Sequence, residues 1–145
     1  MLGLYKDAIA TLERFPLSIL QFAFRLSMGV VFWNSGLVKI QSWVPTVALF
    51  ENEYKVPVLP AETAAMMAAA IELTCPVFLV VGLATRLSTL PMLGVTFVIQ
   101  TFVYPDLWHL HLAWAAALLL ILTKGPGAIS LDYLIEKALL KRAPA

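Results

Sequence analysis

The sequence is poor in charged residues and in cysteine. Only 13% of its 145 residues are charged, compared with about 25% in an ordinary soluble domain. Ten lysines and arginines are balanced by nine acidic residues, so no basic surface is available to bind a phosphate backbone. Nucleic acid is therefore excluded as a partner. The single cysteine, Cys75, excludes an intrachain disulfide and a cysteine-rich metal site.

Familiar catalytic and cofactor motifs are also missing. The chain has no G-x-S-x-G, P-loop, G-x-G-x-x-G or H-E-x-x-H pattern. Its only histidines, His109 and His111, are two residues apart and would point about 160° apart on a helix. We therefore expect no haem and no bound metal. A structural, interfacial role is favoured for both histidines, and a contact with a quinone or a metal is the alternative.

Hydrophobic residues are abundant instead. They make up 61% of the chain, and the mean hydropathy is +0.86. A chain this short has too much surface for its volume to hide so many apolar side chains from water. This composition excludes a disordered segment and a soluble enzyme domain, and it predicts a lipid bilayer as the surrounding solvent.

Four apolar stretches have about the length of roughly 20 residues that a helix needs to cross a bilayer. They cover about residues 16–40, 61–83, 87–104 and 107–123. Because lipid offers no partners for open backbone groups, these stretches must be helices. The sequence therefore predicts an all-α, multi-pass membrane protein whose residues 1–145 form one four-helix domain.

Basic residues in the connecting segments predict the orientation. Seven lie on the side of the two termini and two on the other side, so both termini are expected in the cytoplasm. The seven are Lys6, Arg14, Arg86, Lys124, Lys137, Lys141 and Arg142, and the two are Lys39 and Lys55.

Three further segments have the pattern of amphipathic interfacial helices. They are the N-terminus, which lacks the features of a cleaved signal and is expected to be retained, the first outer loop, and the C-terminal tail. Ser130 is expected to cap the tail helix after the break at Gly125-Pro126-Gly127. The apolar faces comprise Leu2, Tyr5, Ile9 and Leu12 at the N-terminus, and Trp43, Val47, Phe50 and Tyr54 in the loop.

Two ionisable residues lie deep within the predicted spans. Arg25 is about nine residues inside the first span, and Glu72 is near the middle of the second. Because neighbouring antiparallel helices would bring them to comparable depth, we expect the two side chains to form an ion pair. The pair could serve helix packing alone, or it could line a polar cavity that binds a ligand head group or moves a proton.

Small and polar residues accompany these charges. Gly29, Phe32, Gly36 and Lys39 share the helix face of Arg25, and the glycines would let a second helix approach closely. A weaker polar stripe on the third span is expected to make hydrogen bonds between helices. It contains Thr89, Thr96, Gln100 and Tyr104.

These features together resemble the DoxX family of small four-helix membrane proteins. The resemblance covers about residues 18–135. It rests on RLSMGVVFWNSGLVKI in the first span, Phe50, Val56-Pro57, IEL around Glu72, the GLATR turn and the closing GPGAISLD. It implies a four-helix protein of the bacterial inner membrane, and named members of the family are linked to quinone-dependent sulfur oxidation or to oxidoreductase complexes. EYKVPVLP and VIQTFVYPDLWHLHLAW look like the branch found beside genes for copper-binding modified peptides, which implies a metal-stress system.

Three hypotheses of function follow. In the first, the chain is a quinone-linked subunit of an oxidoreductase system. The second is a non-enzymatic anchor or assembly factor that binds a membrane or peripheral protein. The third is a small permease for a metal or an organic acid, which would require a homo-oligomer or partner proteins because no inverted repeat is visible.

The first hypothesis assigns roles to named residues. Arg25 would polarise a quinone carbonyl and Glu72 would relay the proton. The pocket around them would be formed by Lys39, Gly29, Gly36, Gln100 and Tyr104.

Overall fold

The computed structural model describes residues 2–140, which are predominantly helical and contain no strand within that range. Lys141 and Arg142, two of the basic residues used to predict orientation, lie outside the described residues. The elements are α1 (Leu2–Glu13), α2 (Leu17–Gln41), α3 (Trp43–Leu49), η1 (Phe50–Tyr54), α4 (Ala61–Val81), α5 (Thr85–Val98), η2 (Ile99–Val103), η3 (Pro105–Leu107), α6 (Trp108–Lys124) and α7 (Leu131–Leu140).

Four helical segments are long and apolar enough to cross a membrane. They are Leu17–Gln41, Ala61–Val81, Thr85–Val103 and Pro105–Lys124. Each end lies within two residues of the bound predicted from the sequence. The prediction of an all-helical bundle with four apolar spans is confirmed.

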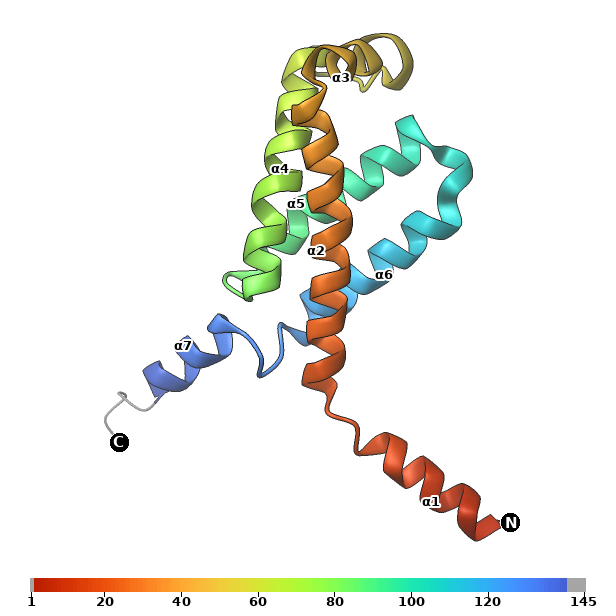
Figure 1. The fold of residues 1–145 in the computed structure, drawn as a ribbon, viewed down its shortest axis with the longest axis vertical. Coiled ribbons are helices and arrows are strands. Elements are labelled where there is room, and N and C mark those ends of the chain that lie inside the picture. The colour runs from red at the N-terminus through yellow and green to blue at the C-terminus, as the bar shows by residue number, and fades with distance from the viewer. Residues whose placement is uncertain (1, 141–145) are drawn as a thin grey trace.

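Helices α2 and α4 run side by side along the bundle (Figure 1). Glycines on α2 set the distance between them. A Cβ atom on Gly36 would lie 3.1 Å from the backbone carbonyl carbon of Glu72 and closer still to the side chain of Leu73. Gly29 similarly lies against Val80. The expected role of these glycines in close helix packing is confirmed.

Helices α5 and α6 form a hairpin that is tilted with respect to α2 and α4 and packs against them (Figure 1). The main hydrophobic core lies where the four long helices meet. Its buried members are Met28, Phe32, Leu79, Met92, Ala117, Leu118 and Ile121.

The first loop folds back onto the bundle. The apolar side of α3 and η1 was predicted to lie on the lipid surface, but it packs on α4 instead. Phe50 is buried against Ala64 and Ala65, and Trp43 and Tyr54 are partly buried in the same cluster. The small alanine side chains leave room for the aromatic rings, so this segment covers one end of the bundle.

Helices α1 and α7 leave the bundle at the opposite end from α3 (Figure 1). Neither helix has a buried residue. The expected cap of α7 is confirmed, because the backbone N–H of Tyr133 donates a hydrogen bond to the Ser130 hydroxyl at 3.2 Å.

Candidate functional site

A cleft of about 770 Å³ opens between the helices toward the α3 end of the bundle. Its volume falls in the range of about 300–1,000 Å³ that small-molecule sites occupy. Most of its lining is apolar, with a few polar side chains from α2, α3, η1, α4, α6 and the turn after η2. The polar members are Ser35, Lys39, Thr46, Tyr54, Glu72, Tyr104 and His111.

The cleft also reaches the outer surface of the bundle. Val38, Met67 and Phe97 belong to its lining, and their exposed fractions are 63%, 49% and 68%. These side chains lie on spans that are expected to contact lipid. A lipid-soluble molecule could therefore enter the cleft sideways, from within the membrane.

An ion pair lies in the wall of the cleft. The Lys39 ammonium is 2.6 Å from Glu72 Oε2, and the pair joins α2 to α4. Ser35, one turn before Lys39 on α2, donates a hydrogen bond to Glu72 Oε1 at 3.2 Å and accepts one from Lys39 Nζ at 3.0 Å. The close approach at Gly36 holds the two helices near enough for these contacts.

The two charges differ in their access to the surroundings. The Glu72 side chain is 1% exposed, whereas that of Lys39 is 17% exposed. Lys39 is therefore the charged group of this pair that a ligand in the cleft can reach.

The expected ion pair between Arg25 and Glu72 is wrong. Arg25 is fully buried nearer the other end of α4, and its guanidinium donates four hydrogen bonds to backbone carbonyls. The acceptors are Leu79 at 2.7 Å, Val80 at 2.5 Å, Pro126 at 2.9 Å and Ile129 at 2.6 Å. Arg25 thus ties the end of α4 to the segment after α6, and it does not line the cleft.

Asp132 supports the same end of the molecule. It accepts hydrogen bonds from the backbone N–H groups of Ala84 at 2.7 Å and Thr85 at 2.9 Å. Burial acts to raise the pKa of Asp132, but these hydrogen bonds and the nearby Arg25 outweigh it, and the pKa lies below its ordinary value. The carboxylate therefore stays ionised and holds the start of α5. Sequence reasoning missed this residue.

His111 lies in the cleft wall, and Gln100 lies behind it. His111 is 3% exposed, and its Nδ1 is 2.7 Å from Gln100 Oε1. The imidazole also meets the Trp114 ring edge-on, with centroids 5.2 Å apart. The expectation that His111 lies at the membrane interface is therefore wrong, because the side chain is buried inside the bundle. A signal was present, because His111, Trp114, Leu118 and Ile121 repeat at the spacing of a core-facing helix surface.

Two tyrosines stand at the end of the cleft beneath the loop. The hydroxyls of Tyr54 and Tyr104 are 3.4 Å apart, and their rings meet edge-on. Tyr54 belongs to η1 and Tyr104 follows η2, and both segments are single π-turns, a distortion frequent at functional sites. The pKa of Tyr54 is raised, because burial and the hydrogen bond with Tyr104 disfavour its phenolate. Its hydroxyl is therefore neutral and able to donate.

The remaining predicted pocket residues have other places. Gly29 and Gly36 are not in the lining, since both lie in the α2–α4 contact. The threonines of the polar stripe were expected to bond between helices, but they bond within their own helix. Thr89 donates to the carbonyls of Thr85 and Arg86, and Thr96 donates to that of Met92. A threonine hydroxyl readily bonds to the carbonyl one turn earlier.

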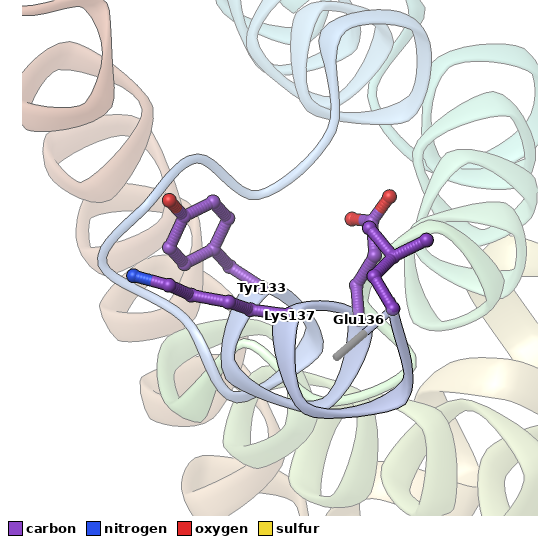
Figure 2. A pocket seen from close by; sticks show the side chains of 4 residues that line it. Tyr133, Glu136 and Lys137 are labelled. Atoms are coloured by element: carbon purple, nitrogen blue, oxygen red, sulfur yellow. The ribbon is translucent and has the colours of Figure 1, made fainter. Parts of the chain in front are cut away.

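Two other hollows lie near the termini. In one, the lining side chains Tyr133, Glu136, Lys137 and Leu140 all come from α7, so it is an exposed helix face (Figure 2). The other is lined by two basic side chains, Arg86 and Lys124, and two acidic ones, Asp132 and Glu136, so it has no net charge of one sign. The cleft near α3 is the stronger candidate, because it has apolar walls and a few convergent polar groups.

The fold and this cleft define a class: a small multi-pass membrane protein whose helix bundle encloses a ligand-sized apolar site. A sequence model of the DoxX family, described as DoxX, matches residues 20–105. The chain belongs to the DoxX family. The match includes Lys39, Glu72 and Gln100, and it ends before His111 and before the GPGAISLD segment of the expected resemblance.

A relative of similar length occurs in Haemophilus influenzae. It is described as an uncharacterized protein and is 30% identical over 125 residues, covering 78% of this chain and 81% of that protein. No solved structure matches the chain.

Proposed function

We propose that the protein is a quinone-linked subunit of an oxidoreductase system in the bacterial inner membrane, and that the cleft binds the quinone head group. The observation that carries the proposal is an apolar cleft that reaches exposed side chains of the spans and contains an ion pair whose carboxylate is buried. A quinone needs both features. Its tail stays in lipid, and its ring oxygens need hydrogen-bond partners away from water.

The cleft residues suggest a division of roles. The role expected for Arg25 passes to Lys39, because only Lys39 has an ammonium in the cleft wall. Lys39 would donate a hydrogen bond to a quinone carbonyl oxygen. Reduction would add to the ring oxygens two electrons, supplied by a partner protein, and two protons, both taken up from water. Glu72, in contact with Lys39, would relay one of these protons.

Quinone binding to the purified protein tests this proposal. We expect the wild-type protein in lipid nanodiscs to bind a benzoquinone with a short alkyl tail, with binding measured as quenching of the protein's tryptophan fluorescence. The double variant Lys39→Met/Glu72→Leu should bind it at least about tenfold more weakly, because a charge-assisted hydrogen bond contributes about 1.5–3 kcal/mol.

Lys124→Met is the matched control, because it removes one lysine at the opposite end of the bundle. Its affinity should equal that of the wild type. A wild-type protein that binds no quinone, or a double variant that binds it unchanged, would refute the proposal.

A second candidate function is a non-enzymatic anchor or assembly factor. The observation in its favour is that α1 and α7 project from the bundle (Figure 1). Both helices have many exposed apolar side chains. Leu134 and Leu139 on α7 are 57% and 63% exposed. In this proposal α7 binds a membrane or peripheral protein.

Truncation after Tyr133 tests the second candidate. The cut keeps the Ile129 carbonyl and the Asp132 carboxylate, which hold the bundle end together. We expect the shortened chain to keep the thermal stability of the full chain while losing any protein that copurifies with it. Retention of the same copurifying protein would exclude α7 as the docking element.

A further inference from the structure

The orientation of the Gln100 side chain is determined by its neighbours. Its amide Nε2 donates a hydrogen bond to the Pro105 carbonyl oxygen at 2.8 Å. Because a carbonyl oxygen only accepts, the amide nitrogen has to occupy that position. The amide oxygen Oε1 is left facing His111 Nδ1, at 2.7 Å.

This arrangement selects the tautomer of His111. The Gln100 oxygen only accepts, so Nδ1 of His111 has to carry the hydrogen. The imidazole is buried, and no ion pair joins it to a carboxylate among residues 2–140, so its neutral form is favoured. In a neutral imidazole with hydrogen on Nδ1, the other ring nitrogen, Nε2, has an unshared electron pair.

That nitrogen is the open hydrogen-bonding position of the cleft. Within the described part of the chain, no side chain or backbone group bonds to His111 Nε2. His111 lines the cleft, so a bound molecule can supply the missing donor. The other polar side chains of the lining already have partners. The two oxygens of Glu72 are engaged by Ser35 and Lys39, Thr46 bonds to the Lys39 carbonyl, and Tyr54 bonds to Tyr104.

We infer that His111 Nε2 accepts a hydrogen bond from a ring hydroxyl of the ligand, and that Gln100 is the positioning residue that keeps it an acceptor. The inference rests on the proposed function, and it names the preferred form of the ligand. A quinol has a hydroxyl that can donate to Nε2. A quinone has only carbonyl oxygens, whose lone pairs would oppose that of Nε2. The cleft therefore selects the quinol over the quinone.

The tautomer can be measured without any ligand. Nitrogen NMR of protein labelled with ¹⁵N-histidine distinguishes a ring nitrogen that bears hydrogen from one that does not. The His109→Gln variant assigns the two histidines. We expect His111 to carry hydrogen on Nδ1 only, and we expect Gln100→Met to shift it toward the Nε2–H tautomer. Hydrogen on Nε2 in the wild-type protein would overturn the inference.

Ligand preference is the second measurement. Under anaerobic conditions we expect a short-chain benzoquinol to bind the wild-type protein about tenfold more tightly than the corresponding quinone, as one added hydrogen bond allows. The dimethyl ether of the quinol keeps both ring oxygens but has no hydroxyl, so it should bind only as well as the quinone.

Variants separate positioning from folding. Gln100→Met and His111→Phe should each bring the ratio of quinol to quinone affinity close to one. His109→Phe, which alters the neighbouring exposed histidine, should preserve the tenfold ratio. If the wild type binds quinol and quinone equally, this inference fails and the proposed function stands. If it binds neither, both fail.

Discussion

Replacing Arg25 with methionine should leave little folded protein. The substitution removes four hydrogen bonds, one buried and three partly buried, and leaves the carbonyls of Leu79, Val80, Pro126 and Ile129 without their donor. Each bond from a charged donor contributes about 1.5–3 kcal/mol, so a loss of about 5 kcal/mol or more is expected. A loss of that size equals the whole stability of many proteins.

Equilibrium unfolding in mixed detergent micelles measures this loss. Arg25→Lys is the matched control, because its ammonium has three N–H donors and can still reach some of the carbonyls. We expect it to lose about half as much stability as Arg25→Met. An Arg25→Met protein that is as stable as the wild type but fails to bind quinone would contradict the structural role. Such a result would support the alternative that Arg25 binds the ligand.

The bundle could be predicted from composition and apolar run length alone. In lipid, the backbone of a helix must make its hydrogen bonds within that helix. Runs of about 20 apolar residues therefore predict membrane-spanning helices. The break at Gly125-Pro126-Gly127 and the cap at Ser130 could also be predicted, because both depend on residues within one helical turn of each other. Local rules and the bilayer thickness together determine these features.

The partner of Glu72 could not be predicted, because it depends on how far α4 is shifted along α2. Matching the helix ends would put Arg25 beside Glu72. Instead, Gly36 packs on Glu72 and Leu73, so the last residue of α2 lies level with a point about six residues inside α4. At 1.5 Å per residue, α4 extends about 9 Å beyond α2. That extension brings Lys39 to Glu72 and takes Arg25 to the far end of α4.

The Arg25 acceptors were unpredictable for a different reason. Two of the four carbonyls belong to a segment more than a hundred residues later in the chain. Backbone carbonyls also carry no residue-specific signal in a sequence. A partner sought among side chains could only be Glu72, the one acid that lies deep within a predicted span.

Replacing Lys39 with methionine should destabilise the protein more than replacing Glu72 with leucine. Lys39→Met leaves the Glu72 carboxylate buried without a counter-ion, which costs about 3–5 kcal/mol. Glu72→Leu leaves Lys39, which stands two residues before the end of α2. Its long, flexible side chain can turn its ammonium toward the membrane surface, so a loss of about 1–2 kcal/mol is expected.

The double variant Lys39→Met/Glu72→Leu should recover most of the stability lost by Lys39→Met, because it leaves no unpaired charge and replaces the ion pair with apolar side chains of similar size. The free energies of unfolding of the wild type, the two single variants and the double variant, measured in mixed micelles, form a double-mutant cycle. Stability that stays as low in the double variant as in Lys39→Met would show that the two charges are not coupled. Recovered stability with weakened quinone binding would instead mean that the pair is kept for the ligand, since the bundle folds without it.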